Sequence, residues 1–323
     1  MKLCVFGAGA VGGHIAAKLA AAGNDVSVVA RGAHLEAMRS RGLKLLHGEQ
    51  IIQGKVRAAE TASALGPQDA VFVTLKANLL SAFADQAECL LGAETAVVFV
   101  QNGIPWWYDA RLVRLDPGGK LARAVAPQRI VGGVAYSANE IVEPGVIENN
   151  VPGNNMLVIG RPDRKDTALV RALRKALDEA DIASPAVEDV RQSIWSKLGQ
   201  NLWTSTLCTL TGMRVSELQE YAELKAIAAR ASEEAGAIAR ALGVALDRAP
   251  RRPSGKSASG AAHKPSMLQD YERGRPMEIE AQLMAPLAFG RAAGVATPTL
   301  DALIPLATFK AAAKGLYAMN FLH

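Results

Sequence analysis

Cysteine and histidine are scarce in this sequence, and neither residue type clusters. The three cysteines lie far apart, at positions 4, 89 and 208, and no Cys-x-x-Cys pair occurs. No two of the five histidines are four residues apart, the spacing that a zinc-binding helix requires. We therefore expect no disulfide framework and no metal site, and isolated cysteines favour a reducing, cytoplasmic compartment.

A membrane-spanning run and a strong charge imbalance are also missing. No apolar stretch approaches the roughly 18 residues of a transmembrane helix. The 36 Lys and Arg residues against 31 Asp and Glu give a formal net charge of +5, which suits an anionic small molecule as well as a nucleic acid. The basic stretch 248–264 has no interleaved aromatics and no nucleic-acid-binding motif. We expect a small-molecule partner, and neither a nucleic acid nor a membrane.

The N-terminus imitates a secretory signal in one respect. Lys2 precedes an apolar run over 3–13, and three alanines follow at 20–22. Four glycines interrupt that run, however, and Lys18 lies just before the supposed cleavage site, which argues against export. We interpret the segment as the start of a folded domain.

The first half of the chain alternates between strand and helix patterns. Buried strands are predicted at 3–6, 26–29, 70–75 and 96–100. Helical spacing follows the first strand up to Gly23 and follows the third up to Leu91. Apolar strands between helices are typical of a parallel sheet that is covered on both faces. From 130 to about 159, short runs with turn signals predict antiparallel strands that complete this sheet.

Beyond residue 188 only helical patterns remain. Helices are predicted over 193–211, 217–242, 277–293 and from about 299 toward the C-terminus. A chain of 323 residues also exceeds the usual single domain of about 100–200 residues. We therefore predict two domains, an α/β domain at 1–188 and a helical domain at 189–323.

The glycine motif Gly7-x-Gly9-x-x-Gly12 lies directly after the first predicted strand and opens the first predicted helix. In the dinucleotide-binding fingerprint such glycines permit a tight turn, a close approach of the backbone to a pyrophosphate, and close packing of helix on strand. The N–H groups of the helix N-terminus then face the phosphates. The predicted cofactor-binding residues of this turn are Gly7, Ala8, Gly9, Ala10, Val11 and Gly12. A merely glycine-rich turn is the alternative.

Arg31 follows the second predicted strand, where an NAD-binding enzyme carries Asp or Glu for the ribose 2′-hydroxyl. A guanidinium at this position suits the 2′-phosphate of NADP instead. Asp25 lies at the opposite end of the strand and cannot replace the missing carboxylate. The sequence thus predicts NADPH/NADP+ as the cofactor, and the alternative is an arginine that is only solvated.

Polar residues end two further strands and mark one helix. Lys76 follows the third predicted strand and Asn102 the fourth, at the edge where open α/β sheets bind ligands. Lys197 and Asn201 are four residues apart and so share a helix face. From these patterns alone, a solvated lysine is the less favoured alternative for Lys76, whereas Lys197 and Asn201 are as likely to lie on the surface as in a site. For the aromatic run 106–108, packing is favoured over a pocket wall.

In this order and spacing, the motifs resemble the ketopantoate reductase (2-dehydropantoate 2-reductase) family over nearly the whole chain. Two further segments, 266–270 and 278–280, complete the match. The resemblance implies an N-terminal Rossmann-type doubly wound sheet and a C-terminal all-helical domain like that of 6-phosphogluconate dehydrogenase. It also implies NADPH and a 2-oxo acid in the cleft between them. The alanine-rich C-terminal helices can bury their faces within one chain or across a homodimer, and both options stay open.

The resemblance also implies roles for the matching residues. Lys197 is expected to be the general acid, and Glu278 is expected to engage the substrate hydroxyl and to contact the cofactor. The other expected contacts are Asn201 and Ser266 with the substrate, Lys76 with the cofactor, and Asn102 with both. An ammonium suits the first role, because hydride transfer turns a carbonyl oxygen into an alkoxide that needs a proton and a positive charge.

Two departures from the family pattern concern the substrate. Ser205 stands where the family commonly has a second asparagine, and we expect it to contact the substrate there; after Glu280 the family's Asn-Gly is missing. Such changes alter selectivity rather than hydride transfer. The predicted function is NADPH-dependent reduction of ketopantoate to pantoate, toward pantothenate and coenzyme A. The alternatives are a reductase of another 2-oxo acid or ketone, and a non-catalytic NADP(H)-binding regulator, against which Lys197 and Glu278 argue.

Overall fold

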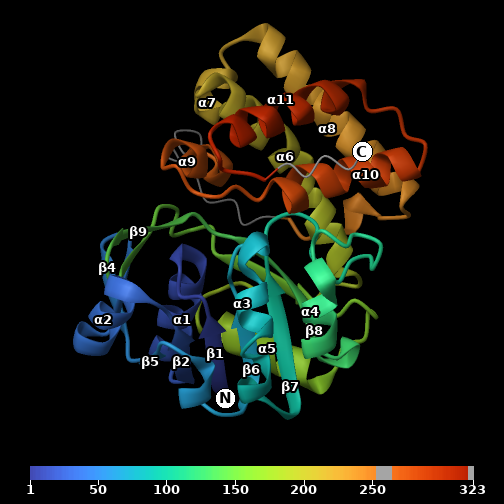
Figure 1. The fold of residues 1–323 in the computed structure, drawn as a ribbon. Helices are drawn as coiled ribbons and strands as arrows, with labels where there is room; N and C mark the ends of the chain where they lie inside the picture. Colours follow the sequence, from blue (N-terminus) through green and yellow to red (C-terminus); the bar gives the residue numbers. More distant parts are fainter. Residues whose placement is uncertain (252–263, 319–323) are drawn as a thin grey trace. The chain divides into compact units, whose positions relative to one another are not determined.

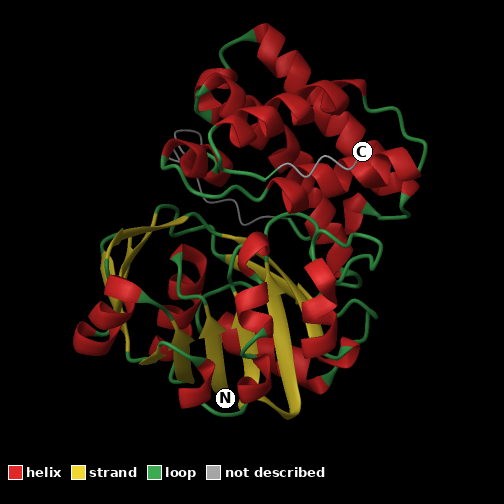
Figure 2. Ribbon diagram, viewed as in Figure 1, coloured by secondary structure: helices red, strands yellow, loops and turns green. Residues whose placement is uncertain are grey.

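The chain forms two compact units (Figure 1). The computed structural model describes residues 1–251 and 264–318, so most of the basic stretch 248–264 lies outside the described residues. The first unit contains Met1–Gln101, Pro105–Val190 and the described residues 250–251. The second contains Asn102–Ile104, Arg191–Ala249 and the described residues from 264 onward. All strands of the described residues belong to the first unit, and the second is helical (Figure 2). The predicted α/β fold with a C-terminal helical part is confirmed.

A seven-stranded sheet forms the centre of the first unit, in the order β11-β8-β7-β6-β1-β2-β5. All neighbouring strands pair in parallel except β11, which is antiparallel to β8. The strands are β1 (Lys2–Phe6), β2 (Asp25–Val29), β5 (Arg57–Ala59), β6 (Gln68–Val73), β7 (Leu91–Val100), β8 (Ile130–Tyr136) and β11 (Met156–Gly160). The four apolar runs of the sequence are confirmed as β1, β2, β6 and β7, although β7 already begins at Leu91.

Helices connect these strands. They are α1 (Ala10–Ala21), α2 (Gly32–Arg41), η1 (Ala62–Ala64), η2 (Ala77–Leu79), α3 (Ser81–Ala84), η3 (Ala87–Leu90), η4 (Pro117–Gly119), α4 (Lys120–Ala124), η5 (Pro127–Arg129) and α5 (Ala168–Glu179). The helix predicted from residue 76 to Leu91 is present only as the short segments η2, α3 and η3. Their final turn runs directly into β7, which leaves no room for a longer helix.

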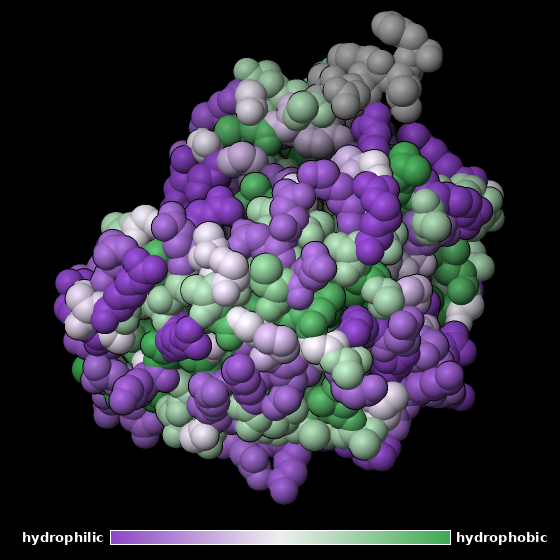
Figure 3. Space-filling view, turned by 60° about the horizontal axis from the view of Figure 1, so that its bottom comes forward, coloured by the Kyte–Doolittle hydropathy of each residue, from purple (hydrophilic) through white to green (hydrophobic). Residues whose placement is uncertain are grey.

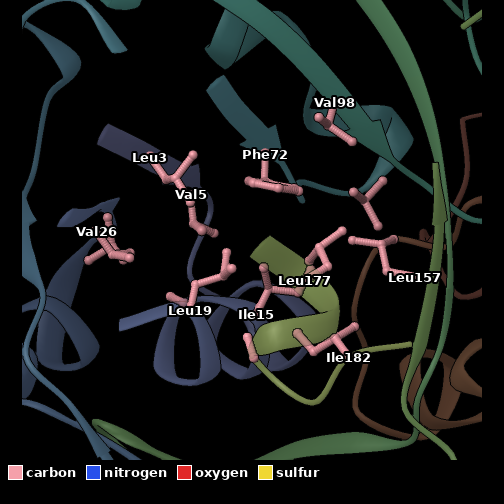
Figure 4. Packing of buried hydrophobic residues seen from close by; sticks show 14 of the residues in the cluster. Leu3, Val5, Ile15, Leu19, Val26, Phe72, Val98, Leu157, Leu177 and Ile182 are labelled. Carbon is pink, nitrogen blue, oxygen red and sulfur yellow. The ribbon is translucent and has the colours of Figure 1, made fainter. Parts of the chain in front are cut away.

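Side chains that alternate along β1 pack on opposite faces of the seven-stranded sheet. Val5 lies in one core with Ile15 of α1 and Leu177 of α5 (Figure 4). Phe6 faces the other side and meets Phe83 of α3 edge to face, with ring centroids 5.2 Å apart. The sheet is therefore covered by apolar groups on both faces, as its continuous apolar strands require.

Helix α1 contacts a second, four-stranded sheet as well as the first. The second sheet has the order β4-β3-β10-β9, with strands β3 (Leu43–His47), β4 (Gln50–Gly54), β9 (Asn139–Glu143) and β10 (Val146–Asn149). The prediction that the strands between 130 and 159 complete one sheet is therefore wrong for β9 and β10. The physical reason lies in α1, because every residue from Gly12 to Leu19 is buried and such a helix needs cover on more than one side.

A lysine is among these buried residues of α1. The Lys18 side chain is 2% exposed, and its Nζ donates to Oδ2 of Asp181 at 2.5 Å and to the Asp181 carbonyl at 3.0 Å. The Asp181 side chain is 83% exposed, so the ion pair is intermediate between a buried and a surface pair. Burial, and to a lesser degree the charge of Lys18, lowers the pKa of the neighbouring His14 to about 3. His14 is therefore neutral near pH 7, and Asp181 is the counter-charge of Lys18.

Asp181→Asn should lower the free energy of unfolding by about 2 kcal/mol, because Lys18 then keeps a carbonyl partner but no counter-charge. Asparagine tolerates the left-handed backbone at this position (φ 53°). The loss of stability therefore comes from the missing charge and not from backbone strain. Urea denaturation measures the change. The control is Asp85→Asn in the exposed pair with Lys120, for which less than about 0.5 kcal/mol is expected. Equal small losses at both sites would contradict the role of Asp181.

The second unit is built from helices. They are α6 (Val190–Thr211), α7 (Val215–Leu218), α8 (Ala222–Ala241), η6 (Leu246–Arg248), α9 (Ser266–Glu272), the π-helix η7 (Glu280–Met284), α10 (Ala285–Ala292) and α11 (Pro298–Ala313). The single helix predicted over 217–242 is in fact α7 and α8. Glu217 accepts a hydrogen bond from the backbone N–H of Arg214 at 2.6 Å. This bond caps the N-terminus of α7, so Glu217 lies in the first turn of α7 and not in α8.

The helix predicted over 277–293 begins with a widened π turn. Pro286, in the first turn of α10, has no N–H for the carbonyl of Gln282 four residues earlier, and its ring would clash there in a regular helix. The π turn η7 relieves this conflict. It begins two residues after Glu278, and π turns are frequent at functional sites.

Apolar residues gather inside each unit. The core of the helical unit includes Leu207, Cys208, Leu218, Ala228 and Leu268. On the face shown in Figure 3, hydrophilic and hydrophobic residues are intermixed. Across residues 1–251 and 264–318, no helix has both the length and the apolar character to cross a membrane.

Candidate active site

The glycine motif forms the turn between β1 and α1. Gly7 has φ +100°, and its N–H and that of Ala8 donate to the Val29 carbonyl at 3.0 and 3.3 Å, which attaches the turn to the end of β2. Within the described part of the chain, a Cβ atom on Gly9 would meet nothing within 4 Å, whereas one on Gly12 would lie 2.3 Å from the Gly7 carbonyl oxygen. The turn is thus tight at Gly7, open at Gly9 and closely packed at Gly12, as a pyrophosphate-binding turn requires.

The N-terminus of α1 has backbone donors to offer a ligand. Its first helical hydrogen bond runs from the Gly13 N–H to the Gly9 carbonyl at 2.7 Å. The N–H groups of Ala10, Val11 and Gly12 therefore have no acceptor inside the helix. Together with the open side of Gly9, these donors fit the pyrophosphate of a dinucleotide.

Side chains tie the ends of three neighbouring strands together. The Thr74 hydroxyl, after β6, donates to the Gly7 carbonyl at 2.6 Å. The Gln101 amide, after β7, donates to the carbonyls of Val73 and Leu75 at 2.8 and 3.2 Å. These bonds fix the loop that leads to Lys76, which is half-buried at the start of η2.

Arg31 is the residue before the first turn of α2, directly beyond the end of β2. Its side chain is exposed, and no hydrogen bond or ion pair of its guanidinium is found among the described residues. No carboxylate side chain occupies residues 26–35, so this strand end presents a cation and no carboxylate for a ribose hydroxyl.

In the helical unit, Lys197 and Asn102 form a direct contact. Lys197 lies on α6, and its Nζ donates to Asn102 Oδ1 at 2.6 Å. Asn201 and Ser205 follow on the same face of α6, at spacings of four residues. Lys197 and Asn201 are half-buried, while Ser205 is 2% exposed. The structure thus brings together a lysine and an asparagine that are 95 residues apart in the sequence.

The segment Asn102–Ile104 is held against the π turn. The Ile104 N–H donates to the Ala281 carbonyl at 2.8 Å. Gly103 has φ +86°, and a Cβ atom on it would lie 2.4 Å from the same carbonyl oxygen. Glycine is therefore needed at 103 for Asn102 to reach its position beside Lys197.

Glu278 precedes the π turn and is 8% exposed. Its Oε2 accepts a hydrogen bond from Gln282 Nε2 at 3.3 Å, and the Gln282 side chain is itself 2% exposed. Glu280 instead accepts from the Tyr317 hydroxyl at 2.7 Å. The sequence reading missed Gln282, although two polar residues four apart in an apolar helical stretch were a usable signal.

The other expected site residues are less closely connected. Ser266 is the first residue of α9 and is exposed, and its side chain makes no hydrogen bond within the described part of the chain. In the aromatic run, Trp106 is 7% exposed and meets Phe99 edge to face at 5.3 Å, which makes it a core residue. In residues 1–251 and 264–318, no group of three His, Cys, Asp or Glu side chains could hold a metal ion.

A dinucleotide-binding turn on a parallel sheet, with a helical unit that offers an ammonium, an amide and a buried carboxylate, defines a nicotinamide-dinucleotide-dependent oxidoreductase. Residues 3–163 match the family described as ketopantoate reductase PanE/ApbA, and residues 189–311 match its C-terminal part. The chain belongs to the ketopantoate reductase family and acts on the CH–OH/C=O couple, as the resemblance implied.

Relatives match the chain over almost its full length. The 2-dehydropantoate 2-reductase of Mesorhizobium japonicum is 40% identical over 98% of this chain and 100% of its own. The crystal structure of a putative ketopantoate reductase from Ralstonia solanacearum has a TM-score of 0.86 at 32% identity, covering 98% of this chain and 99% of the other. A D-mandelate dehydrogenase in complex with NADH and anilino(oxo)acetate shares the fold, with a TM-score of 0.82 at 21% identity, covering 98% and 100% of the two chains.

Proposed function

We propose that this protein reduces ketopantoate (2-dehydropantoate) to pantoate with NADPH, in the synthesis of pantothenate and coenzyme A. The observation that carries the proposal is the contact between Lys197 and Asn102 at 2.6 Å. An ammonium whose direction is set by an amide oxygen is the group that a developing alkoxide needs. The 2-dehydropantoate 2-reductase that is 40% identical over 98% of the chain supports this choice of substrate.

The chemistry assigns a proton transfer to Lys197. The bound cofactor supplies a hydride to the carbonyl carbon of the substrate. The carbonyl oxygen keeps the electron pair of the broken π bond, and the Lys197 ammonium donates a proton to it. The neutral amine that remains takes a proton from solvent before the next turnover. Asn102 Oδ1 accepts a hydrogen bond from the Lys197 ammonium and so helps to fix the direction of the ammonium.

Further residues are proposed to hold the substrate. Asn201 and Ser205 share the face of α6 that carries Lys197, and Ser266 opens α9. Glu278 is proposed to accept a hydrogen bond from the substrate hydroxyl and to contact the cofactor. Because Glu278 is only 8% exposed, a hydroxyl that reaches it is largely removed from water, which strengthens the hydrogen bond.

NADPH is proposed to lie on the turn formed by residues 7–12, with Lys76 toward its nicotinamide and Arg31 toward its 2′-phosphate. Arg31→Ala should raise KM for NADPH by about 10- to 100-fold and change KM for NADH less than twofold, because only NADPH carries the 2′-phosphate. Steady-state kinetics with both cofactors measure the split. Arg39→Ala, in the exposed pair with Glu36 on the same helix, is the control. Equal increases for both cofactors would contradict the assignment.

A panel of keto acids tests the substrate. With NADPH, ketopantoate should give the highest kcat/KM among branched and aromatic 2-oxo acids. The alternative is a reductase of another 2-oxo acid or ketone, which Ser205 favours, because a buried hydroxyl occupies less space than an asparagine amide. If another keto acid gave a clearly higher kcat/KM, that compound would replace ketopantoate as the proposed substrate, and the reaction class would stay the same.

The compartment and the assembly are part of the same proposal. Cys4, Cys89 and Cys208 are free thiols, which is compatible with the reducing cytoplasm. A homodimer and a monomer both stay open, because the alanine-rich C-terminal helices can bury their faces in either way, and sedimentation velocity over a range of protein concentrations distinguishes the two.

A further inference from the structure

His34, on the first turn of α2, joins two segments that are distant in the sequence. Its Nε2 lies 2.7 Å from the carbonyl oxygen of Ala8, in the glycine turn. Its Nδ1 lies 2.9 Å from the backbone nitrogen of Gly145, in the turn between β9 and β10. Both ring nitrogens therefore have a main-chain partner.

The two partners determine the tautomer of the ring. A backbone N–H can only donate, so Nδ1 must be the acceptor of the Gly145 hydrogen bond and carries no proton. In the neutral ring the proton is then on Nε2, which donates it to the Ala8 carbonyl. Burial lowers the pKa of His34, opposed by the smaller effect of the Ala8 hydrogen bond, and this favours the neutral ring.

The Gly145 end of this bridge is firmly attached. The Gly145 carbonyl accepts a hydrogen bond from the Lys44 N–H at 2.9 Å, which fixes the turn to β3. Gly145 has φ +84°, and a Cβ atom on it would lie 3.0 Å from the Ala37 side chain on α2. The turn thus packs closely on the helix that carries His34.

The Ala8 end of this bridge lies in the glycine turn. The Ala8 N–H already donates to the Val29 carbonyl at 3.3 Å, and the His34 bond engages its carbonyl as well. Both polar groups of Ala8 are therefore fixed, and so is the peptide plane between Ala8 and Gly9. That plane sets the direction in which the N-terminus of α1 presents its N–H groups.

We propose that His34 is a positioning residue for the cofactor's pyrophosphate, and that it acts by holding the Ala8 carbonyl of the glycine turn. The inference rests on the proposed use of this turn for NADPH. It differs from the role of Arg31, because the pyrophosphate is common to NADPH and NADH and the 2′-phosphate is not. Loss of His34 therefore raises the dissociation constants of NADPH and NADH by the same factor.

The experiment measures dissociation constants by isothermal titration of the apo-protein with NADPH and with NADH, without any keto acid. His34→Phe keeps a ring of similar size and removes both hydrogen bonds, and it should raise both dissociation constants about tenfold. His34→Gln supplies one donor and one acceptor and should stay within about threefold of the wild type. Ser40→Ala, at the far end of α2, is the control and should change neither constant.

The outcomes separate this inference from the proposed function. A His34→Phe protein that binds both cofactors as the wild type does, or that loses only NADPH, overturns the role of His34. If His34→Phe does not fold, His34→Gln and the ¹⁵N spectrum of the wild-type imidazole decide, and a proton on Nδ1 would overturn the assignment. Wild-type protein that binds NADPH but reduces no ketopantoate contradicts the proposed function and leaves the role of His34 supported by the binding data.

Discussion

Replacing Lys197 with alanine should lower kcat for ketopantoate by about 10²- to 10⁴-fold, while the dissociation constant of NADPH stays within about twofold. The reason is that the variant binds cofactor on the glycine turn as before but lacks the group that protonates the developing alkoxide. Stopped-flow measurement of NADPH oxidation gives the rate, and titration without substrate gives the affinity. Lys225→Ala, an exposed lysine on α8, is the matched control and should leave kcat unchanged.

Lys197→Arg distinguishes proton donation from charge alone. A guanidinium keeps the positive charge but does not release a proton in the working pH range, so kcat should stay close to that of the alanine variant. Recovery of most of the activity in the arginine variant would mean that charge is sufficient. An unchanged rate in Lys197→Ala would remove the general-acid role altogether, and a wild type that binds NADPH without any turnover would favour the regulator instead.

The sequence was most informative where a function depends on neighbours in the chain. The turn from Gly7 to Gly12 and the position of Arg31 at the end of β2 can be read from about 30 residues, because strand, turn and helix follow one another without interruption. The division into a sheet-containing part and a helical part was equally accessible, since the period of the apolar residues changes from strand-like to helical.

The features that the sequence did not indicate depend mostly on contacts between residues far apart in the chain. His34 bonds to Ala8, 26 residues earlier, and to Gly145, 111 residues later, and no local pattern joins these three. The second sheet was missed for the same reason, because β3 pairs with β10 across about a hundred residues. The π turn before Pro286 was missed because a proline in the first turn of α10 was interpreted within one continuous helix.

Gly9→Ala should weaken NADPH binding about 100-fold without destabilising the protein. Among the described residues, a Cβ atom at residue 9 meets nothing within 4 Å, so we expect a methyl group there to collide with a ligand that approaches the backbone. The backbone of Gly9 has φ −69°, which alanine adopts without strain, and the smaller freedom of the unfolded chain should even raise the melting temperature slightly. Isothermal titration and thermal unfolding measure the two quantities on the same sample.

Gly12→Ala provides the contrast, because its Cβ atom would lie 2.3 Å from both the Gly7 carbonyl oxygen and Thr74 Oγ1. This variant should lose about 3 kcal/mol of unfolding free energy as well as cofactor affinity, since helix and strand must move apart. The two substitutions thus differ in what the new methyl group collides with. At residue 9 it collides with the ligand, and at residue 12 it collides with the protein itself. If Gly9→Ala keeps NADPH affinity within about threefold of the wild type, the pyrophosphate does not lie on this turn.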